Sequence, residues 1–221
     1  MHRKISSLQY LTQDLPDFSH IEQVRMACDA GIEWIQLRMK NKSTDEYMKI
    51  SAMARKITYD SGVKLIINDH VEIAGEVGAD GVHLGREDMY WKAARIILGE
   101  DVLIGGSAHS WDELISLRDA NVDYAGLGPF RFTSTKINLD EVLGLEGIIS
   151  IMKLMQQHSF QLPVIAIGGI ELNDVNDLIA AGVNGIAVSS AINKAANPRN
   201  ALINFLESVK NSFSNHEKVN T

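Results

Sequence analysis

The stretch AGVNGIAV at residues 181–188 occurs in four related versions along the chain, and this repetition decides the fold. Each version joins the end of a helical pattern, a polar residue and the start of an apolar strand pattern. The other three are AGIEWIQL at 30–37, VGADGVHL at 77–84 and ANVDYAGL at 120–127. They lead into the second, fourth, sixth and eighth of the strands that the apolar runs predict. A unit that recurs in this way indicates repeated βα modules.

Short apolar runs alternate with longer amphipathic stretches from one end of the chain to the other. Eight such units in this length predict an α/β fold, a single (β/α)8 TIM barrel with its active site at the C-terminal ends of the strands. A doubly wound open sheet is the alternative, although the chain carries no dinucleotide fingerprint. The predicted strands are 8–14, 34–38, 64–69, 81–85, 103–108, 124–128, 163–169 and 185–190.

No linker or shift in composition divides the sequence. We therefore expect one domain over 1–221, with frayed ends at about 1–7 and 212–221. An apolar content of 45% in 221 residues supports a substantial core. The net charge of −7 argues against a nucleic-acid partner, which would require a basic face. An anionic ligand would need local cations or a metal ion to hold it against this overall charge.

The single cysteine, Cys28, excludes an internal disulfide and a cysteine-based zinc site. It lies in a helical pattern, which favours a structural thiol over a nucleophile. The first residues contain no apolar run of signal-peptide length, and no stretch has the length of a membrane span. We expect a cytoplasmic protein without a membrane partner, and a homo-oligomer is left open.

The second predicted strand ends in Gln36, Arg38 and Lys40, which strand alternation places on one side. An amide and two cations facing a barrel mouth would suit an anionic ligand, although an ordinary charged loop has the same composition. The fifth strand adds the hydroxyl of Ser107, followed by His109, which is either an acid/base group or a structural residue. His83 falls inside a strand and is expected to be a packed, hydrogen-bonded core residue.

Carboxylates follow two neighbouring strands. Asp69 closes the third strand after Asn68, and Asp88 follows the fourth. Either could cap a helix, but two aspartates on adjacent strand ends can share a hard cation such as Mg²⁺, which leaves coordination sites for phosphate oxygens. Asp69 and Asp88 are therefore the predicted metal ligands, with Glu87 as the alternative that spacing leaves open.

Two further strand ends carry features of phosphate binding. The sixth strand leads into Thr133, Ser134, Thr135 and Lys136, a run of hydroxyls and one cation that fits a phosphate better than a packing role. A surface loop is the alternative. The seventh strand ends in Gly168 and Gly169 and the eighth in Ser189 and Ser190, where many barrels bind phosphate. Two anion sites indicate two phosphorylated substrates, or one that is phosphorylated at both ends.

The series QLRMK, IINDH, GVHLGREDM, GGSAH, GLGP…TSTK, AIGGI and VSSAI resembles the thiamine-phosphate synthase family, in the family's order and over about residues 8 to 206. The resemblance implies condensation of 4-amino-2-methyl-5-(diphosphooxymethyl)pyrimidine with 4-methyl-5-(2-phosphoethyl)thiazole or its carboxylated form. The products are thiamine phosphate and diphosphate, with CO2 from the carboxylated form. It also implies a dissociative substitution assisted by one Mg²⁺ ion on Asp69 and Asp88.

The resemblance assigns the remaining motif residues to the two substrates. The pyrimidine diphosphate would be held by Gln36, Arg38, Lys40, Asn68, Ser107 and Lys136. Of these, the catalytic residues would be Arg38, Lys40, Ser107 and Lys136. The thiazole phosphate would be held by Thr133, Ser134, Thr135, Gly169, Ser189 and Ser190.

Three departures from the family pattern are visible. The chain reads GPFRFT at 128–133, with Arg131 and without a second proline. His70 stands where arginine is common, and Arg86 where glutamine is common. None removes a residue assigned to substrate or metal, but they leave the thiazole side of the pocket less defined. A related thiazole tautomerase and a non-catalytic barrel that binds thiamine precursors are the alternative functions.

Overall fold

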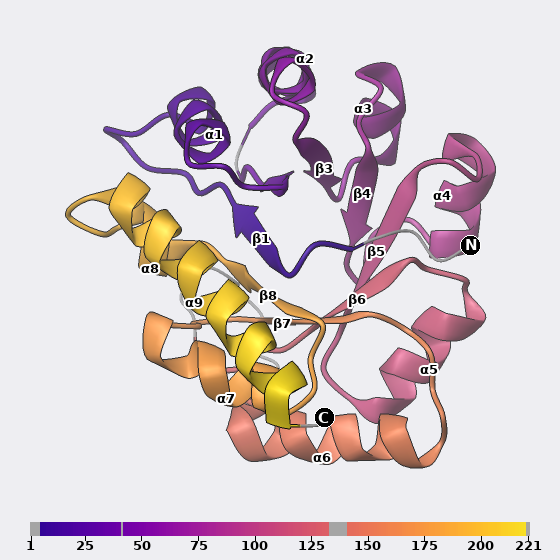
Figure 1. The fold of residues 1–221 in the computed structure, drawn as a ribbon. Coiled ribbons are helices and arrows are strands. Elements are labelled where there is room, and N and C mark those ends of the chain that lie inside the picture. The colour runs from indigo at the N-terminus through magenta and orange to yellow at the C-terminus, as the bar shows by residue number, and fades with distance from the viewer. Residues whose placement is uncertain (1–4, 41, 133–140, 220–221) are drawn as a thin grey trace.

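The computed structural model describes residues 5–40, 42–132 and 141–219. Among them, eight parallel strands close into a barrel in sequence order, and the helices surround it (Figure 1). The predicted (β/α)8 barrel is confirmed, and the doubly wound open sheet is wrong because β1 pairs with β8 and closes the sheet. The strands are β1 (Leu8–Leu11), β2 (Trp34–Leu37), β3 (Lys64–Asn68), β4 (Gly81–Leu84), β5 (Leu103–Ala108), β6 (Tyr124–Leu127), β7 (Val164–Ile167) and β8 (Gly185–Val188).

A helix follows each strand, and the first two begin with reciprocal capping boxes built on Ser19 with Glu22 and Ser43 with Glu46. Within the described ranges, none of the helices combines the length and the apolar character that crossing a membrane requires. The helices are α1 (His20–Asp29), α2 (Thr44–Asp60), α3 (Val71–Glu76), α4 (Trp91–Leu98), α5 (Trp111–Asp119), α6 (Gly144–Gln157), the 3-10 turn η1 (Leu172–Asp174), α7 (Val175–Ala180), α8 (Ser190–Asn193) and α9 (Pro198–Val219).

Most strands end earlier than the sequence predicts. β1 ends at Leu11 rather than at residue 14, and the Thr12 and Asp14 side chains beyond it bond to the loop that follows β2. β3 ends before Asp69, whose φ of 67° leaves the extended region. β7 ends before Gly168 and Gly169, whose φ values are 103° and 65°. The polar strand ends of the sequence therefore lie in the βα loops, where a barrel places its ligands.

The polar residue of the repeated stretch has a structural role that its pattern did not reveal. Asp80 precedes β4, and its carboxylate accepts the Leu65 N–H of β3 at 2.8 Å while its own N–H donates to the Leu65 carbonyl at 2.9 Å. Asp123 makes the same pair of bonds with Ile104 of β5, at 2.7 and 2.8 Å. Asn184 makes them with Val164 of β7, both at 2.8 Å. We call these three two-bond contacts the strand clasps.

Two of the strand clasps also carry an ion pair to an outer helix. Arg55 of α2 donates to the Asp80 carboxylate at 2.7 Å, and Arg95 of α4 donates to Asp123 at 2.6 Å. The Arg95 and Asp123 side chains are only 11% and 18% exposed, so solvent screens this pair weakly. Each of these clasps therefore joins two strands and one helix at the N-terminal end of the barrel, opposite the predicted site.

The C-terminal helix packs across the start and end of the chain. α9 contacts α1, α7, α8 and β1 (Figure 1). The helix continues through residues 212–219, where the sequence predicted a frayed end. Ser212 is buried there and donates to the Ser208 carbonyl at 2.7 Å and to the Asn176 side chain. Ser212 therefore belongs to the packed part of α9.

Replacing Asp123 tests the strand clasps. Asp123→Ala removes the acceptor of the Ile104 N–H and the carboxylate partner of Arg95, which keeps its bonds to the Gly99 and Val102 carbonyls. We expect the free energy of unfolding to fall by about 2–4 kcal/mol. Glu33→Ala is the control, because Glu33 occupies the same place in its repeat but its exposed carboxylate bonds to Ser6. We expect a loss below about 1 kcal/mol there. Equal losses in urea unfolding would show that the clasp bonds add nothing.

Candidate functional site

A cavity of about 340 Å³ opens at the C-terminal ends of the strands. It is lined by many of the residues that the sequence singled out, drawn from different loops. Lys40 is not among the lining residues, and Thr133, Ser134, Thr135 and Lys136 lie outside the described part of the chain. The lining residues that the sequence predicted are Gln36, Arg38, Asn68, Asp69, Asp88, Ser107, Gly169, Ser189 and Ser190.

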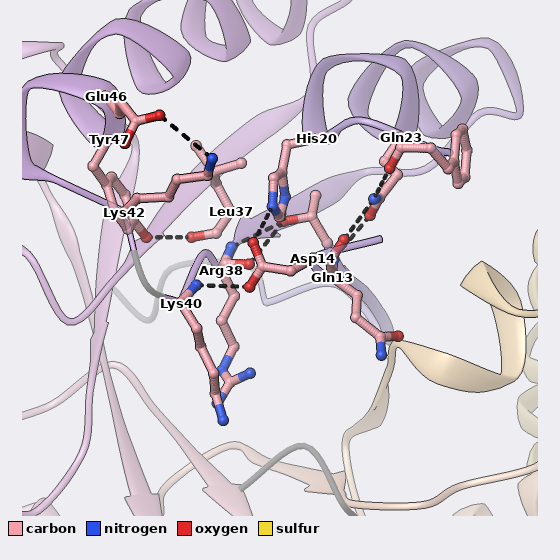
Figure 2. A network of polar contacts seen from close by, with 12 residues as sticks. Gln13, Asp14, His20, Gln23, Leu37, Arg38, Lys40, Lys42, Glu46 and Tyr47 are labelled. Carbon is pink, nitrogen blue, oxygen red and sulfur yellow. Dashed lines mark hydrogen bonds and ion pairs between the residues drawn. The ribbon is translucent and has the colours of Figure 1, made fainter. Parts of the chain in front are cut away.

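The loop after β2 is held by the loop after β1. The Thr12 hydroxyl accepts the Arg38 N–H at 3.0 Å and donates to the Arg38 carbonyl, while the Asp14 carboxylate accepts the Lys40 N–H at 2.8 Å. His20 of α1 lies behind both, with Nδ1 2.9 Å from the Thr12 hydroxyl and Nε2 3.0 Å from Asp14 (Figure 2). Thr12, Asp14 and His20 thus orient the loop after β2, which carries Arg38 and Lys40 and which we call the cationic loop.

The two cations of this loop extend in the same direction, as Figure 2 shows for Arg38 and Lys40. Met39 between them is buried, which agrees with the predicted alternation. Burial and the neighbouring Arg38 charge lower the pKa of Lys40, and Asp14 and Asp69 oppose that effect. Lys40 is thus electrostatically coupled to Arg38 and Asp69 although it lies outside the cavity lining. The pair forms a concentration of positive charge at the mouth.

Asp69 and Asp88 lie close together at the ends of β3 and β4. Desolvation raises the pKa of the Asp69 carboxyl to about 7, the Asp88 carboxylate adds to the effect, and Arg38 opposes it. Asp88 is oriented by the Gly85 N–H, which donates to its carboxylate at 2.6 Å. A cation bound between the two carboxylates would relieve the repulsion between Asp69 and Asp88.

This pair of carboxylates fits Mg²⁺. Within the described ranges, no group of three or more histidine, cysteine, aspartate or glutamate side chains forms a metal cluster. Mg²⁺ needs no such cluster, because it commonly takes one or two carboxylates and fills its other positions with water and phosphate oxygens. Glu87 is exposed and also lines the cavity, so it remains the alternative ligand.

A second polar region lies at the ends of β7 and β8. Gly168 and Gly169 have positive φ, and neither has room for a side chain, since a Cβ would lie 2.7 Å from the Pro129 Cα and 2.9 Å from the Arg131 Cβ, respectively. The Ser189 hydroxyl accepts from Asn193 at 3.3 Å, which leaves its own proton to donate elsewhere. Backbone and hydroxyl donors of this kind suit a phosphate group.

Arg131, the departure from the family pattern, connects the loops after β6 and β7. Its guanidinium makes a two-pronged ion pair with Asp174 at 2.8 and 2.9 Å and donates to the Gly169 carbonyl at 2.6 Å. Its backbone N–H donates to the Gly168 carbonyl at 2.8 Å. The hydrogen bond from Arg131 lowers the pKa of Asp174. Arg131 therefore holds Gly168 and Gly169, which we call the glycine loop, in place. The sequence motif did not indicate this role.

The described residues on either side of the Thr133–Lys136 segment are bound together. The Leu143 N–H donates to the Pro129 carbonyl at 2.9 Å, and the Gly144 N–H donates to the Phe130 carbonyl at 3.1 Å. The Phe130 N–H in turn donates to the Ile167 carbonyl of β7 at 2.8 Å. Phe130 and Gly144 thus lie beside the end of β7.

His109 contacts the carboxylate of Glu113, with Nδ1 2.7 Å from Oε2, and Arg86 pairs with the same carboxylate at 2.9 Å. The three residues line one side of the cavity. Both roles considered for His109 stay predictions. The expectation for His83 is confirmed, because it is buried and bonded to Tyr124 and Ser107. Burial raises the pKa of Cys28, which agrees with a structural thiol.

In metal-free solution we expect the free energy of unfolding to fall as pH rises from about 4 to about 7. The raised pKa of Asp69 means that the folded protein binds this proton more tightly than the unfolded chain, so the contribution is lost as pH passes the folded pKa of about 7. Asp69→Asn should reduce this decline in urea unfolding with chelator present, whereas Asp45→Asn, at an exposed site on α2, should not. If the free energy of unfolding of Asp69→Asn fell with pH as steeply as that of the wild type, the Asp69 proton would not be the cause of the decline.

A sequence profile of the family described as thiamine monophosphate synthase matches residues 10–192. The thiamine-phosphate synthase of Bacteroides fragilis (strain YCH46) is 45% identical over 192 residues, which cover 87% of this chain and 94% of the relative. That of Clostridium novyi (strain NT) is 42% identical over 173 residues, which cover 78% of this chain and 82% of the relative.

The solved structure of a thiamine phosphate pyrophosphorylase from Pyrococcus furiosus superposes with a TM-score of 0.82 at 33% identity. The match covers 93% of this chain and 96% of that one. A structure described as native KDPGal matches with a TM-score of 0.70 at 15% identity, which shows a likeness of fold alone.

Proposed function

Because the chain belongs to the thiamine monophosphate synthase family, we propose that its cavity joins two phosphorylated substrates at the residues described above. The activity is that of a thiamine-phosphate synthase, a transferase. The relatives support this main interpretation and not the tautomerase alternative. The residue roles, the metal ion and the order of bond changes are the proposal. Cytoplasmic location and a homo-oligomer stay predictions.

The observation that carries the proposal is the presence of two separate polar regions around one cavity. One combines Arg38 and Lys40 with the carboxylates Asp69 and Asp88, and the other consists of the glycine loop and the hydroxyls after β8. A diphosphate with its cation matches the first, and a phosphate monoester matches the second. An enzyme acting on one singly phosphorylated molecule would not need both regions.

The pyrimidine diphosphate is assigned to the region after β2 to β5. Arg38 and Lys40 bind the diphosphate, Lys136 contributes a further cation, and Gln36, Asn68 and Ser107 provide neutral polar groups. Asp69 and Asp88 would hold Mg²⁺, which when bound neutralises diphosphate charge and favours its departure. The Thr12, Asp14 and His20 contacts keep the cationic loop oriented before substrate arrives, so less ordering is needed on binding.

The thiazole phosphate is assigned to the region after β6 to β8. Gly169 supplies backbone donors, Ser189 and Ser190 supply hydroxyls, and Thr133, Ser134 and Thr135 complete the site. The support for this assignment is the tight contact between the two loops, in which the Phe132 carbonyl would lie 3.2 Å from a Cβ at Gly169. Binding the phosphate here would fix the thiazole beside the pyrimidine.

The proposed reaction is a dissociative substitution. The bond between the pyrimidine methylene carbon and the diphosphate oxygen breaks first, and its electron pair leaves with diphosphate. The cation is stabilised by the aminopyrimidine ring, and the thiazole nitrogen then forms the new bond to the methylene carbon. The residues therefore bind, orient and stabilise the leaving charge, which requires no protein nucleophile. The carboxylated thiazole would lose CO2 as well.

A direct assay tests the activity and the metal ligands. With both substrates and Mg²⁺, we expect thiamine phosphate and diphosphate in equal amounts, and none with excess chelator. Asp88→Asn should lower kcat by about 100-fold, since a charged metal contact is lost. Glu87→Gln is the control at the adjacent position in the same cavity, with an expected change below about threefold.

A larger loss in Glu87→Gln than in Asp88→Asn would transfer the metal site to Glu87. Binding of both substrates without product would favour the non-catalytic barrel. Isomerisation of the thiazole carboxylate without condensation would favour the tautomerase. The first outcome would contradict the assignment of the metal ligands, and the other two would contradict the synthase activity.

Arg131→Ala tests the thiazole side. We expect KM for the thiazole phosphate to rise by about five- to tenfold, because the glycine loop loses its support, with KM for the pyrimidine diphosphate unchanged. Arg118→Ala is a matched control, since Arg118 is 47% exposed against 48% for Arg131 and likewise pairs with an aspartate. Each also lies over a phenylalanine ring, at 4.8 and 4.9 Å. Equal effects on both KM values would contradict the assignment.

A further inference from the structure

Five side chains from five different strands form a chain of hydrogen bonds across the barrel interior. Gln36 Nε2 of β2 donates to Gln9 Oε1 of β1 at 3.2 Å, and Gln9 Nε2 donates to the Tyr124 hydroxyl of β6 at 3.4 Å. The Tyr124 hydroxyl is 3.1 Å from His83 Nδ1 of β4, and His83 Nε2 is 3.0 Å from the Ser107 hydroxyl of β5. We call this set the polar chain.

The polar chain begins and ends in the cavity lining but passes beneath it. Gln36, His83 and Ser107 line the cavity, whereas Tyr124 lies two residues before the lining residue Gly126 on β6. Tyr124 has no exposed surface, and Gln9 is buried beside it. No substrate can therefore touch the Tyr124 hydroxyl, and any influence of this group on the reaction passes through its partners.

Two glycines provide the space for the rings of the polar chain. A Cβ at Gly105 would lie 2.2 Å from the Tyr124 Cζ, and one at Gly126 would lie 3.1 Å from the His83 Cε1. The Gly105 position therefore excludes every side chain as long as Tyr124 keeps its place. Gly105, inside β5, thus has a role in packing around Tyr124.

One order of donors gives every hydrogen of the polar chain a partner. In this order the phenol oxygen of Tyr124 accepts from the Gln9 amide and donates its own proton to His83 Nδ1. An imidazole that accepts at Nδ1 carries its proton on Nε2 in the neutral state, and that proton goes to Ser107 Oγ. The Ser107 proton is then left to point into the cavity. Burial raises the pKa of Tyr124, which keeps the phenol protonated.

We propose that Tyr124 is a positioning residue which, through His83, fixes Ser107 as a hydrogen-bond donor to the leaving diphosphate. This inference rests on the proposed function, because it takes Ser107 to face the pyrimidine diphosphate. A hydroxyl can donate or accept, and a phosphate oxygen only accepts, so a fixed donor removes the unproductive orientation before the substrate binds. At the other end of the polar chain, Gln36 donates to Gln9 and Gln9 donates to the Tyr124 hydroxyl, which orients the Tyr124 proton toward His83.

Tyr124→Phe retains the ring and its packing but removes the hydroxyl. We expect kcat to fall on the order of tenfold with little change in KM for either substrate, because the lost orientation matters most as charge develops on the diphosphate. Ser107→Ala should lower kcat by at least about tenfold by itself. In the Ser107→Ala background, Tyr124→Phe should change kcat by less than about twofold, since its effect passes through Ser107. Ser212→Ala, which removes a buried hydroxyl from α9, is the control for general destabilisation.

The tautomer of His83 gives a second measurement that requires no active variant. In protein labelled with 15N-histidine, with the His83 signal assigned from His83→Gln, we expect the proton on Nε2 in the wild type. A proton on Nδ1 would reverse the donor order and overturn the proposal. Additive effects of Tyr124→Phe and Ser107→Ala would overturn it as well. Full activity in Ser107→Ala would instead remove Ser107 from the proposed function, which separates the two failures.

Discussion

The two-bond clasp that Asp80, Asp123 and Asn184 make with the preceding strand sets the register of the barrel. In a strand, a shift of one residue moves every side chain to the opposite face. The same shift here would turn His83 of β4 and Ser107 of β5 away from the interior and bring apolar neighbours into the mouth. The clasps act at the N-terminal end, yet the alignment of loops at the C-terminal end depends on them. The strand clasps and the candidate site thus lie at opposite ends of the barrel.

At the C-terminal end, the local charges oppose the charge of the whole molecule. The chain carries a net charge of −7, but Arg38 and Lys40 lie at the mouth beside Asp69 and Asp88, whose charge a cation would neutralise. The Glu113 carboxylate in the cavity lining pairs with Arg86. The site can therefore attract two anionic substrates in a protein that is negative overall. The loops that carry these groups are held from behind, by Thr12 and Asp14 on one side and by Arg131 on the other.

The fold and much of the site could be predicted from the sequence, because both follow from local patterns. The repeated stretch revealed the βα units. A polar residue at the C-terminal end of any barrel strand lies at the mouth of the barrel. The supports of the site were not predictable in this way. Asp14 meets Lys40, Arg131 meets Asp174 and Tyr124 meets His83 across sequence separations that only the closed barrel brings together. The first predicted strand was too long for the same reason, since Thr12 bonds to a loop that no local pattern indicates.

The most direct measurement of the central claim is a crystal structure of the protein with Mg²⁺ and diphosphate. The claim is that the aligned strand ends form one diphosphate and metal site from the loops after β2 to β5. The account predicts the metal ion on Asp69 and Asp88 and the diphosphate against Arg38, Lys40 and Ser107. A metal ion and diphosphate bound at the glycine loop after β7, with Asp69 and Asp88 contacting neither, would contradict it.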